Sequence, residues 1–132
     1  MTKSYHISDV LSVMSGNILS TRKPYPIDAF YDVLSYMTND EIFTHQLTRV
    51  CDECAPFLKE CFPELAAIDV AHINKENHAE EIAKIIEKYG EMVGVPRLPA
   101  GVHKVINPIV ELITKAAELN RSSSSKDDVQ TH

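Results

Sequence analysis

The chain has 132 residues, 44% of them hydrophobic, and a formal net charge of −6 at pH 7. This length is typical of one domain of about 100–150 residues. The apolar runs are far shorter than the roughly 18 residues of a membrane span, and the first six residues lack the apolar stretch of a secretion signal. We therefore expect a protein without membrane contact that stays in the cytoplasm.

The negative charge is concentrated in the middle of the chain. Residues 40–90 contain eleven acids and five bases, whereas the segments before and after them are each neutral overall. Nucleic-acid binding needs a basic surface that displaces counterions from phosphates, so direct nucleic-acid binding is disfavoured. A protein partner with a basic surface is favoured. The candidate partner-binding residues are acids of this segment: Asp40, Glu41, Asp52, Glu53, Glu76, Glu80 and Glu81.

The N-terminal region predicts two helices. Ser8 is a good N-cap, apolar residues follow it at helical spacing, and Gly16 offers a stop, which predicts a helix over 8–15. A proline-containing linker follows, because each proline lacks a backbone donor. From Pro26, apolar residues recur at i, i+3, i+4 and i+7, which predicts a second helix over 26–37.

A third helix is predicted from His45, with Thr44 as its cap. Its apolar face includes Cys51 and Cys54. A proline inside a helix costs about 3 kcal/mol. We therefore expect Pro56 to break this helix near Ala55.

The next segment predicts a strand–helix–strand unit. Residues 66–73 alternate weakly and predict a strand, and residues 92–95 predict a second short strand. Between them, Asn74 or Asn77 caps a helix that ends at Gly90. The two strands would then lie parallel to each other.

Asn107 and Pro108 are typical of a helix start and predict a last helix over 108–119. We expect its apolar stripe to be buried; the stripe consists of Ile109, Leu112, Ile113, Ala116 and Leu119. The Ser-rich segment 121–132 has no periodic apolar residues to offset the entropy of ordering, which predicts a disordered tail.

The predicted fold is thus mainly α: one small helical domain over residues 1–120 with a minor two-stranded β element. An α+β domain is the alternative. No internal repeat indicates a solenoid.

Three nearby cysteines are the sharpest chemical motif. Cys51-Asp52-Glu53-Cys54 is a CxxC motif, and with Cys61 and His45 it offers four ligands of the types that bind zinc. Because these cysteines lie on the apolar stripe of their own helix, packing in the core is the favoured interpretation. Zinc binding and redox use stay open as alternatives, and the thiols are expected to be free in a reducing cytosol.

The Thr44-His45-Gln46 cluster has residue types found in catalytic sites and lies near Asp40 and Glu41. No nucleophile elbow, phosphate loop or HExxH motif accompanies it. The favoured interpretation is a helix start at which Thr44 caps and His45 hydrogen-bonds locally. We expect no enzymatic activity, no cofactor and no bound metal.

The segment Tyr36-Met37-Thr38-Asn39-Asp40-Glu41-Ile42-Phe43-Thr44-His45-Gln46-Leu47 resembles a motif of small bacteriophage-encoded proteins of unassigned function. Weaker similarity extends to Ile7–Val13 and to Asn107–Leu112. Where such proteins have a polar residue and Gly before the Asp of this turn, this chain has Asn39. The resemblance brings no catalytic residues. It implies a phage accessory protein, and such small acidic products often inhibit a host defence complex.

Three hypotheses follow. The first is a non-enzymatic interaction protein in the host cytoplasm that inhibits a host defence complex of the CRISPR or restriction type, its acidic surface replacing nucleic-acid phosphates. The second is a structural or regulatory phage protein that forms a homo-oligomer through its helices. The third is a small Cys/His metal or thiol protein.

Overall fold

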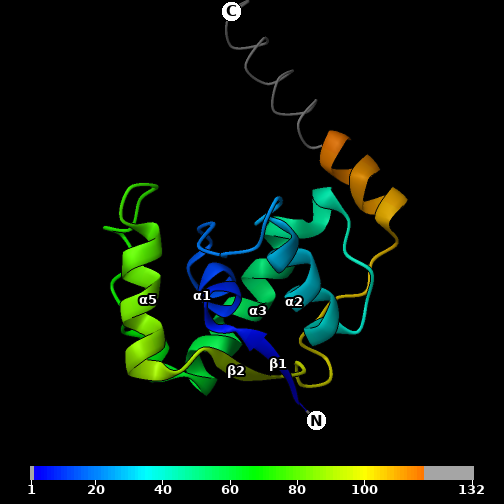
Figure 1. Cartoon of the computed structure of the whole chain (residues 1–132). Helices are drawn as coiled ribbons and strands as arrows, with labels where there is room; N and C mark the ends of the chain where they lie inside the picture. Colours follow the sequence, from blue (N-terminus) through cyan, green and yellow to red (C-terminus); the bar gives the residue numbers. More distant parts are fainter. Residues whose placement is uncertain (1, 118–132) are drawn as a thin grey trace, which may run out of the picture.

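The computed structural model describes residues 2–117, and the structural statements below concern this part of the chain (Figure 1). It confirms a mainly α domain with a minor two-stranded sheet. A last helix covers residues 108–117, up to the end of the described range. The other elements are β1 (Thr2–His6), α1 (Ile7–Ser15), α2 (Asp28–Thr38), the 3-10 turn η1 (Thr44–Gln46), α3 (Leu47–Cys61), α4 (Pro63–Ala66), α5 (His78–Tyr89) and β2 (Met92–Pro96).

The helices expected over 8–15 and 26–37 are confirmed as α1 and α2. The helix expected to end at Gly90 is confirmed as α5, with Asn77 at its N-terminal boundary. The expected tail, and the expected ends of the last helix and of the domain, lie outside the described residues.

The sheet differs from the sequence prediction. Residues 92–96 do form a strand, but they pair antiparallel with β1, with Tyr5 opposite Val93. Residues 66–73 form the end of α4 and a turn in which the Ile73 N–H donates to the Val70 carbonyl. The expected strand there and the expected parallel pairing are both wrong. The partner strand comes from the N-terminus, whose mostly polar residues carry little strand signal.

α1 is the centre of the core. It lies between α5 and α2, with α3 behind it (Figure 1), and it contacts both α2 and α3. Every residue from Ile7 to Met14 is buried, including Ser8, Asp9 and Ser12. Val50, Cys54 and Leu58 of α3 and Ile82 and Ile85 of α5 complete this core.

α3 runs without interruption through Pro56, so the expected break near Ala55 is wrong. Pro56 lies on the exposed side of the helix, four residues after the exposed Asp52. Water can therefore hydrogen-bond to the carbonyl that the proline leaves without a donor. The buried side of α3 has an uninterrupted series of apolar contacts, which stabilises the helix across the proline.

The three cysteines have different environments. Cys54 is fully buried, Cys51 is half-buried with its thiol donating to the Val13 carbonyl at 3.4 Å, and Cys61 is exposed. Core packing therefore holds for Cys54 and in part for Cys51. It is wrong for Cys61, which lies at the C-terminal end of α3.

Replacing Cys54 by serine should lower the free energy of unfolding by about 1–3 kcal/mol, because the hydroxyl would be buried among apolar side chains. The matched substitution Cys61→Ser should change it by less than about 0.5 kcal/mol, because that side chain is exposed. Urea denaturation of both variants measures the difference. Equal effects would contradict the placement of Cys54 in the core.

Candidate functional site

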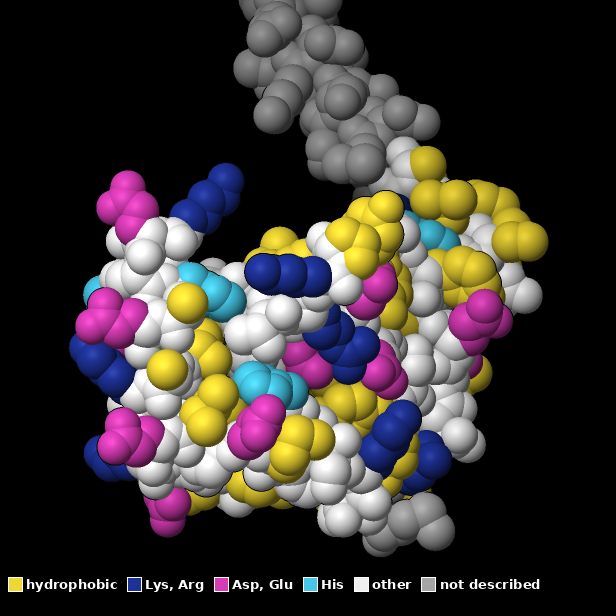
Figure 2. Space-filling model, in the orientation of Figure 1, with side chains coloured by type: hydrophobic (Ala, Val, Ile, Leu, Met, Phe, Trp, Pro, Cys, Tyr) yellow, Lys and Arg dark blue, Asp and Glu magenta, His cyan; other side chains and the backbone are white. Residues whose placement is uncertain are grey.

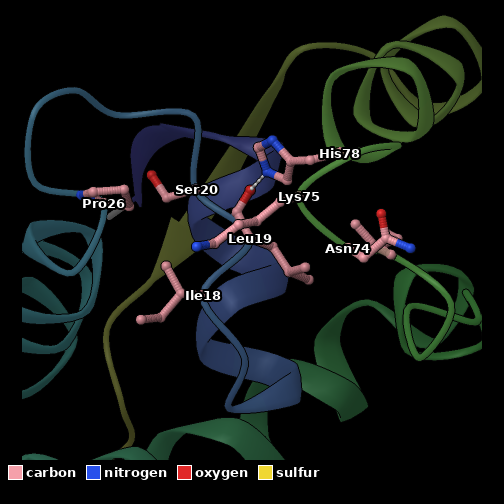
Figure 3. A pocket seen from close by; sticks show the side chains of 8 residues that line it. Ile18, Leu19, Ser20, Pro26, Asn74, Lys75 and His78 are labelled. Carbon is pink, nitrogen blue, oxygen red and sulfur yellow. Dashed lines mark hydrogen bonds between the residues drawn. The ribbon is translucent and has the colours of Figure 1, made fainter.

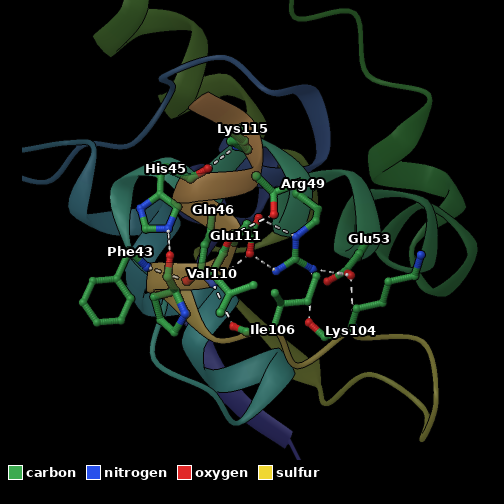
Figure 4. A network of polar contacts seen from close by, with 12 residues as sticks. Phe43, His45, Gln46, Arg49, Glu53, Lys104, Ile106, Val110, Glu111 and Lys115 are labelled. Atoms are coloured by element: carbon green, nitrogen blue, oxygen red, sulfur yellow. Dashed lines mark hydrogen bonds and ion pairs between the residues drawn. The ribbon is translucent and has the colours of Figure 1, made fainter. Parts of the chain in front are cut away.

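The C-terminal helix is attached to the domain through a polar contact centred on Glu111 (Figure 4). Arg49 of α3 donates from Nε and from Nη2 to the two carboxylate oxygens of Glu111, each at 2.8 Å. The Gln46 amide donates to the same carboxylate at 3.0 Å. These bonds lower the pKa of Glu111 to about 2, with the Arg49 hydrogen bonds as the main cause. Glu111 is therefore a buried carboxylate that stays charged and fully paired.

Two further contacts attach the helix on either side of Glu111. The His45 Nε2 atom lies 2.7 Å from the Pro108 carbonyl oxygen, and the Lys115 ammonium donates to the carbonyl of His45. The expectation that His45 hydrogen-bonds locally is thus wrong, because its partner lies 63 residues away. The hydrogen bonds between this helix and the rest of the domain thus use polar side chains of the helix or its backbone.

The segment before the helix is fixed by His103. Its ring lies between two carboxylates, with Nδ1 2.5 Å from Glu53 Oε1 and Nε2 3.0 Å from Asp40 Oδ2. Its side chain is only 7% exposed. Glu53 also accepts from Arg49 and from the backbone N–H of Lys104.

These contacts change the interpretation of the acidic candidates. Asp40 and Glu53 lie together, but they pair with His103 inside the protein. Glu81 of α5 pairs with Lys84 of the same helix and with His72 in the turn before it.

Four of the seven candidates remain exposed: Glu41, Asp52, Glu76 and Glu80. The start of α5 lies on the opposite side of the domain from the 108–117 helix (Figure 1). Acids and lysines are interspersed over the α5 side (Figure 2). The seven acids therefore do not form one patch.

The 108–117 helix has the reverse of the orientation expected from its sequence. Glu111 is buried, whereas Ile109 is 69% and Ile113 63% exposed, and Val110 and Leu112 are also exposed. The expectation that Ile109, Leu112 and Ile113 form a buried stripe is therefore wrong. We call Ile109, Val110, Leu112 and Ile113 the outer face. Figure 2 shows apolar side chains gathered in this region, beside the end of the described chain.

The outer face borders a groove with a volume of about 340 Å³. Ile109 and Leu112 line it from the helix, and Phe43 lines it from the segment before η1. Phe43 is itself 41% exposed and its ring stacks near the ring of His45, with centroids 6.3 Å apart. The apolar surface thus extends from the helix onto the segment before η1.

A second hollow, of about 510 Å³, lies between the loop after α1 and the segment that leads into α5 (Figure 3). At its wall, His78 Nε2 lies 2.6 Å from the Leu19 carbonyl oxygen. An adjoining groove of about 280 Å³ shares the exposed Ile18 and includes Asp52. The lining is mainly apolar, and the one histidine is bonded to the backbone. The hollow joins two parts of the chain but does not assemble a catalytic set of side chains.

A second polar network lies at the N-terminal side of the core. Arg22 bridges two carboxylates, Asp9 at 3.0 Å and Asp32 at 2.8 Å. Burial alone would raise the pKa of Asp32, but hydrogen bonds from Arg22 and Tyr5 lower it overall. Burial, followed by the bond to Asp32, raises the pKa of Tyr5 well above its usual value. Asp9 also accepts from Ser20 at 2.6 Å, so this network ties the loop after α1 to α1 and α2.

The thiols have little nucleophilic character. Burial raises the pKa of Cys54 to about 12 and also raises the pKa of Cys51. A thiol with a raised pKa is protonated at neutral pH and reacts slowly. Among residues 2–117, no group of three or more His, Cys, Asp or Glu side chains is arranged to hold a metal ion.

The sequence reasoning missed His103, Arg49 and Glu111. His103 was one of several scattered histidines, and nothing in its neighbouring residues indicates two distant carboxylates. For Glu111 there was a signal: it is the one acid in an otherwise apolar stretch, and a lone charge there can face a partner inside the protein.

Residues 5–68 match a known family model. A domain of unknown function, DUF7736, is found at residues 5–68. Comparison with curated proteins gave no match, and neither did comparison with solved structures. The matched segment runs from Tyr5 through α4 and includes Asp40, Gln46, Arg49 and Glu53. The side chains that bind to these residues, His103 and Glu111, lie outside the match.

No helix within the described part of the chain is long and apolar enough to span a bilayer.

Replacing Glu111 by glutamine should weaken the attachment of the 108–117 helix at pH 7, because the Arg49 guanidinium loses the negatively charged partner of its two hydrogen bonds. The pKa of Glu111 is lowered in the folded protein, so its stabilisation is present above about pH 4.5 and is lost as the pH falls toward about 2. The difference in amide exchange protection of this helix between the native protein and the variant should therefore shrink between about pH 5 and pH 2.

The matched variant Glu80→Gln removes the charge of an exposed acid that pairs with Lys84. It should leave protection of the 108–117 helix unchanged at every pH. A difference for Glu111→Gln that is the same at pH 7 and pH 3 would show that the carboxylate charge does not hold the helix.

Proposed function

We propose that this protein is a non-enzymatic interaction protein that works by presenting surfaces to other proteins. One observation carries the proposal: the 108–117 helix uses its polar residues to bind the domain and leaves its apolar residues outside. Exposed apolar surface is costly unless it meets a partner, and contiguous patches of this kind mark interaction sites. A helix that only filled the core would have the opposite orientation.

The state of the titratable side chains supports the non-enzymatic part of the proposal. His45 and His78 bond to backbone carbonyl oxygens, and both ring nitrogens of His103 face carboxylates. General acid–base chemistry needs a side chain that can exchange a proton with a substrate. These rings instead fix loops and the C-terminal segment to the domain.

We further propose that the protein is a bacteriophage accessory product that acts in the host cytoplasm. The resemblance of the Tyr36–Leu47 segment to small phage proteins supports this origin. Its target would be a host defence complex that handles nucleic acid, and the contact would be between exposed acids and the basic surface that normally binds phosphates. Glu76 and Glu80, which are exposed in and just before α5, support a contact of this kind.

The acidic contact predicts a specific effect of charge reversal. The double variant Glu76→Lys/Glu80→Lys should slow association with a partner isolated from host lysate by roughly tenfold at low salt, because long-range attraction depends on local charge. At physiological salt the effect should be smaller. Surface plasmon resonance at two salt concentrations measures both rates.

The matched control is Glu60→Lys/Glu64→Lys, which changes the net charge equally at two exposed acids of α3 and α4. It should slow association less than Glu76→Lys/Glu80→Lys. Equal association rates for the native protein and Glu76→Lys/Glu80→Lys would reject the acidic contact. Equal slowing by both variants would show that total charge, and not the α5 surface, sets the rate.

A further inference from the structure

The outer face has the properties of the centre of a protein interface. Ile109 and Leu112 of this face line one groove with Phe43, which is also exposed, and contiguous apolar patches of this kind mark interaction sites. A standard interface buries about 800 Å² per partner. The patch can therefore supply the apolar centre of one side of such an interface.

The direction of the patch is fixed by the polar contacts on the other side of the helix. At about 100° per residue, positions 109, 113 and 116 fall within about 60° of one another and opposite position 111. Because Arg49 and Gln46 hold Glu111 against the domain, Ile109 and Ile113 must face outward. The surface is thus preorganised, which lowers the entropy cost of binding.

Charge decides which partner suits this patch. The helix has two charged side chains within the described residues, Glu111 and Lys115, and both point toward the domain and are bonded there. The outer face itself has no charge. A basic partner would gain nothing from an uncharged face. Two copies of this acidic chain repel each other overall, and an uncharged apolar face is where they can approach at least cost.

We propose that the outer face is the contact surface of a homodimer, in which the 108–117 helices of two copies pack against each other about a twofold axis. A twofold contact joins the same patch on both copies, and an apolar helix face is self-complementary in this way. Ala116 and Ala117 are exposed and small, so they allow the helix axes to come close. This inference rests on the proposed function only in assigning the outer face to protein contact.

Sedimentation equilibrium of the full chain from micromolar to several hundred micromolar tests the proposal. The native protein should approach twice its chain mass of 14.8 kDa. The double variant Ile109→Glu/Ile113→Glu should stay at 14.8 kDa over the same range, because four like charges would meet at the axis. Circular dichroism of the variant reports whether its helices are retained. The mass of the native protein tests the dimer whether or not the variant folds.

The matched control is Ile18→Glu, the same substitution at a side chain that is 58% exposed in a different groove. It should leave the dimer intact. A native protein that remains monomeric at several hundred micromolar overturns the proposal, as does a dimer that persists in Ile109→Glu/Ile113→Glu or dissociates equally in Ile18→Glu.

Two other occupants of the face would give different results. A monomer that cosediments with phosphatidylcholine vesicles through the same isoleucines would assign the face to a lipid surface. A monomer that dimerises only after residues 118–132 are deleted would assign it to that segment. If no dimer forms, the charge-reversal experiment is unaffected, because it measures association with a different partner through Glu76 and Glu80.

Discussion

The ion pair between Arg49 and Glu111 is the contact on which the outer surface of this protein depends. It holds a helix of mostly apolar residues by its one acidic side chain, which is buried and accepts bonds from both Arg49 and Gln46. A buried charge is strongly destabilising when its partner is removed, so this pair restricts the helix to one orientation. The exposed isoleucines follow from that restriction and not from any preference of their own.

The same contact joins two parts of the chain with different relationships to known proteins. Arg49, Gln46 and the carboxylates that hold His103 lie in the segment that matches DUF7736, whereas Glu111 and His103 lie beyond it. The matched segment thus provides the surface to which the segment with His103 and Glu111 binds. Asp40 and Glu53 look in the sequence like free surface acids, but both pair with His103 of the later segment.

Much of the helical fold could be predicted from the sequence, because α1, α2 and α5 each combine a regular apolar face with a residue typical of a helix boundary, namely Gly16, Pro26 and Gly90. The sheet could not be predicted, because β1 is mostly polar and its partner β2 lies far along the chain from it. Pro56 misled the prediction because its missing donor falls on the exposed side of α3. The orientation of the last helix could not be predicted either, because periodicity identifies an apolar face without saying what covers it.

The most direct test of this account compares two substitutions on opposite sides of the last helix, in protein dilute enough to be monomeric. If Glu111 faces the domain, Glu111→Leu should lower the free energy of unfolding by about 2 kcal/mol, because Arg49 and Gln46 lose their buried acceptor. Ile113→Gln should change it by less than about 0.5 kcal/mol, as expected for an exposed side chain. The reverse result, with Ile113→Gln the more destabilising substitution, would show that the apolar side of the helix is buried and would contradict the account.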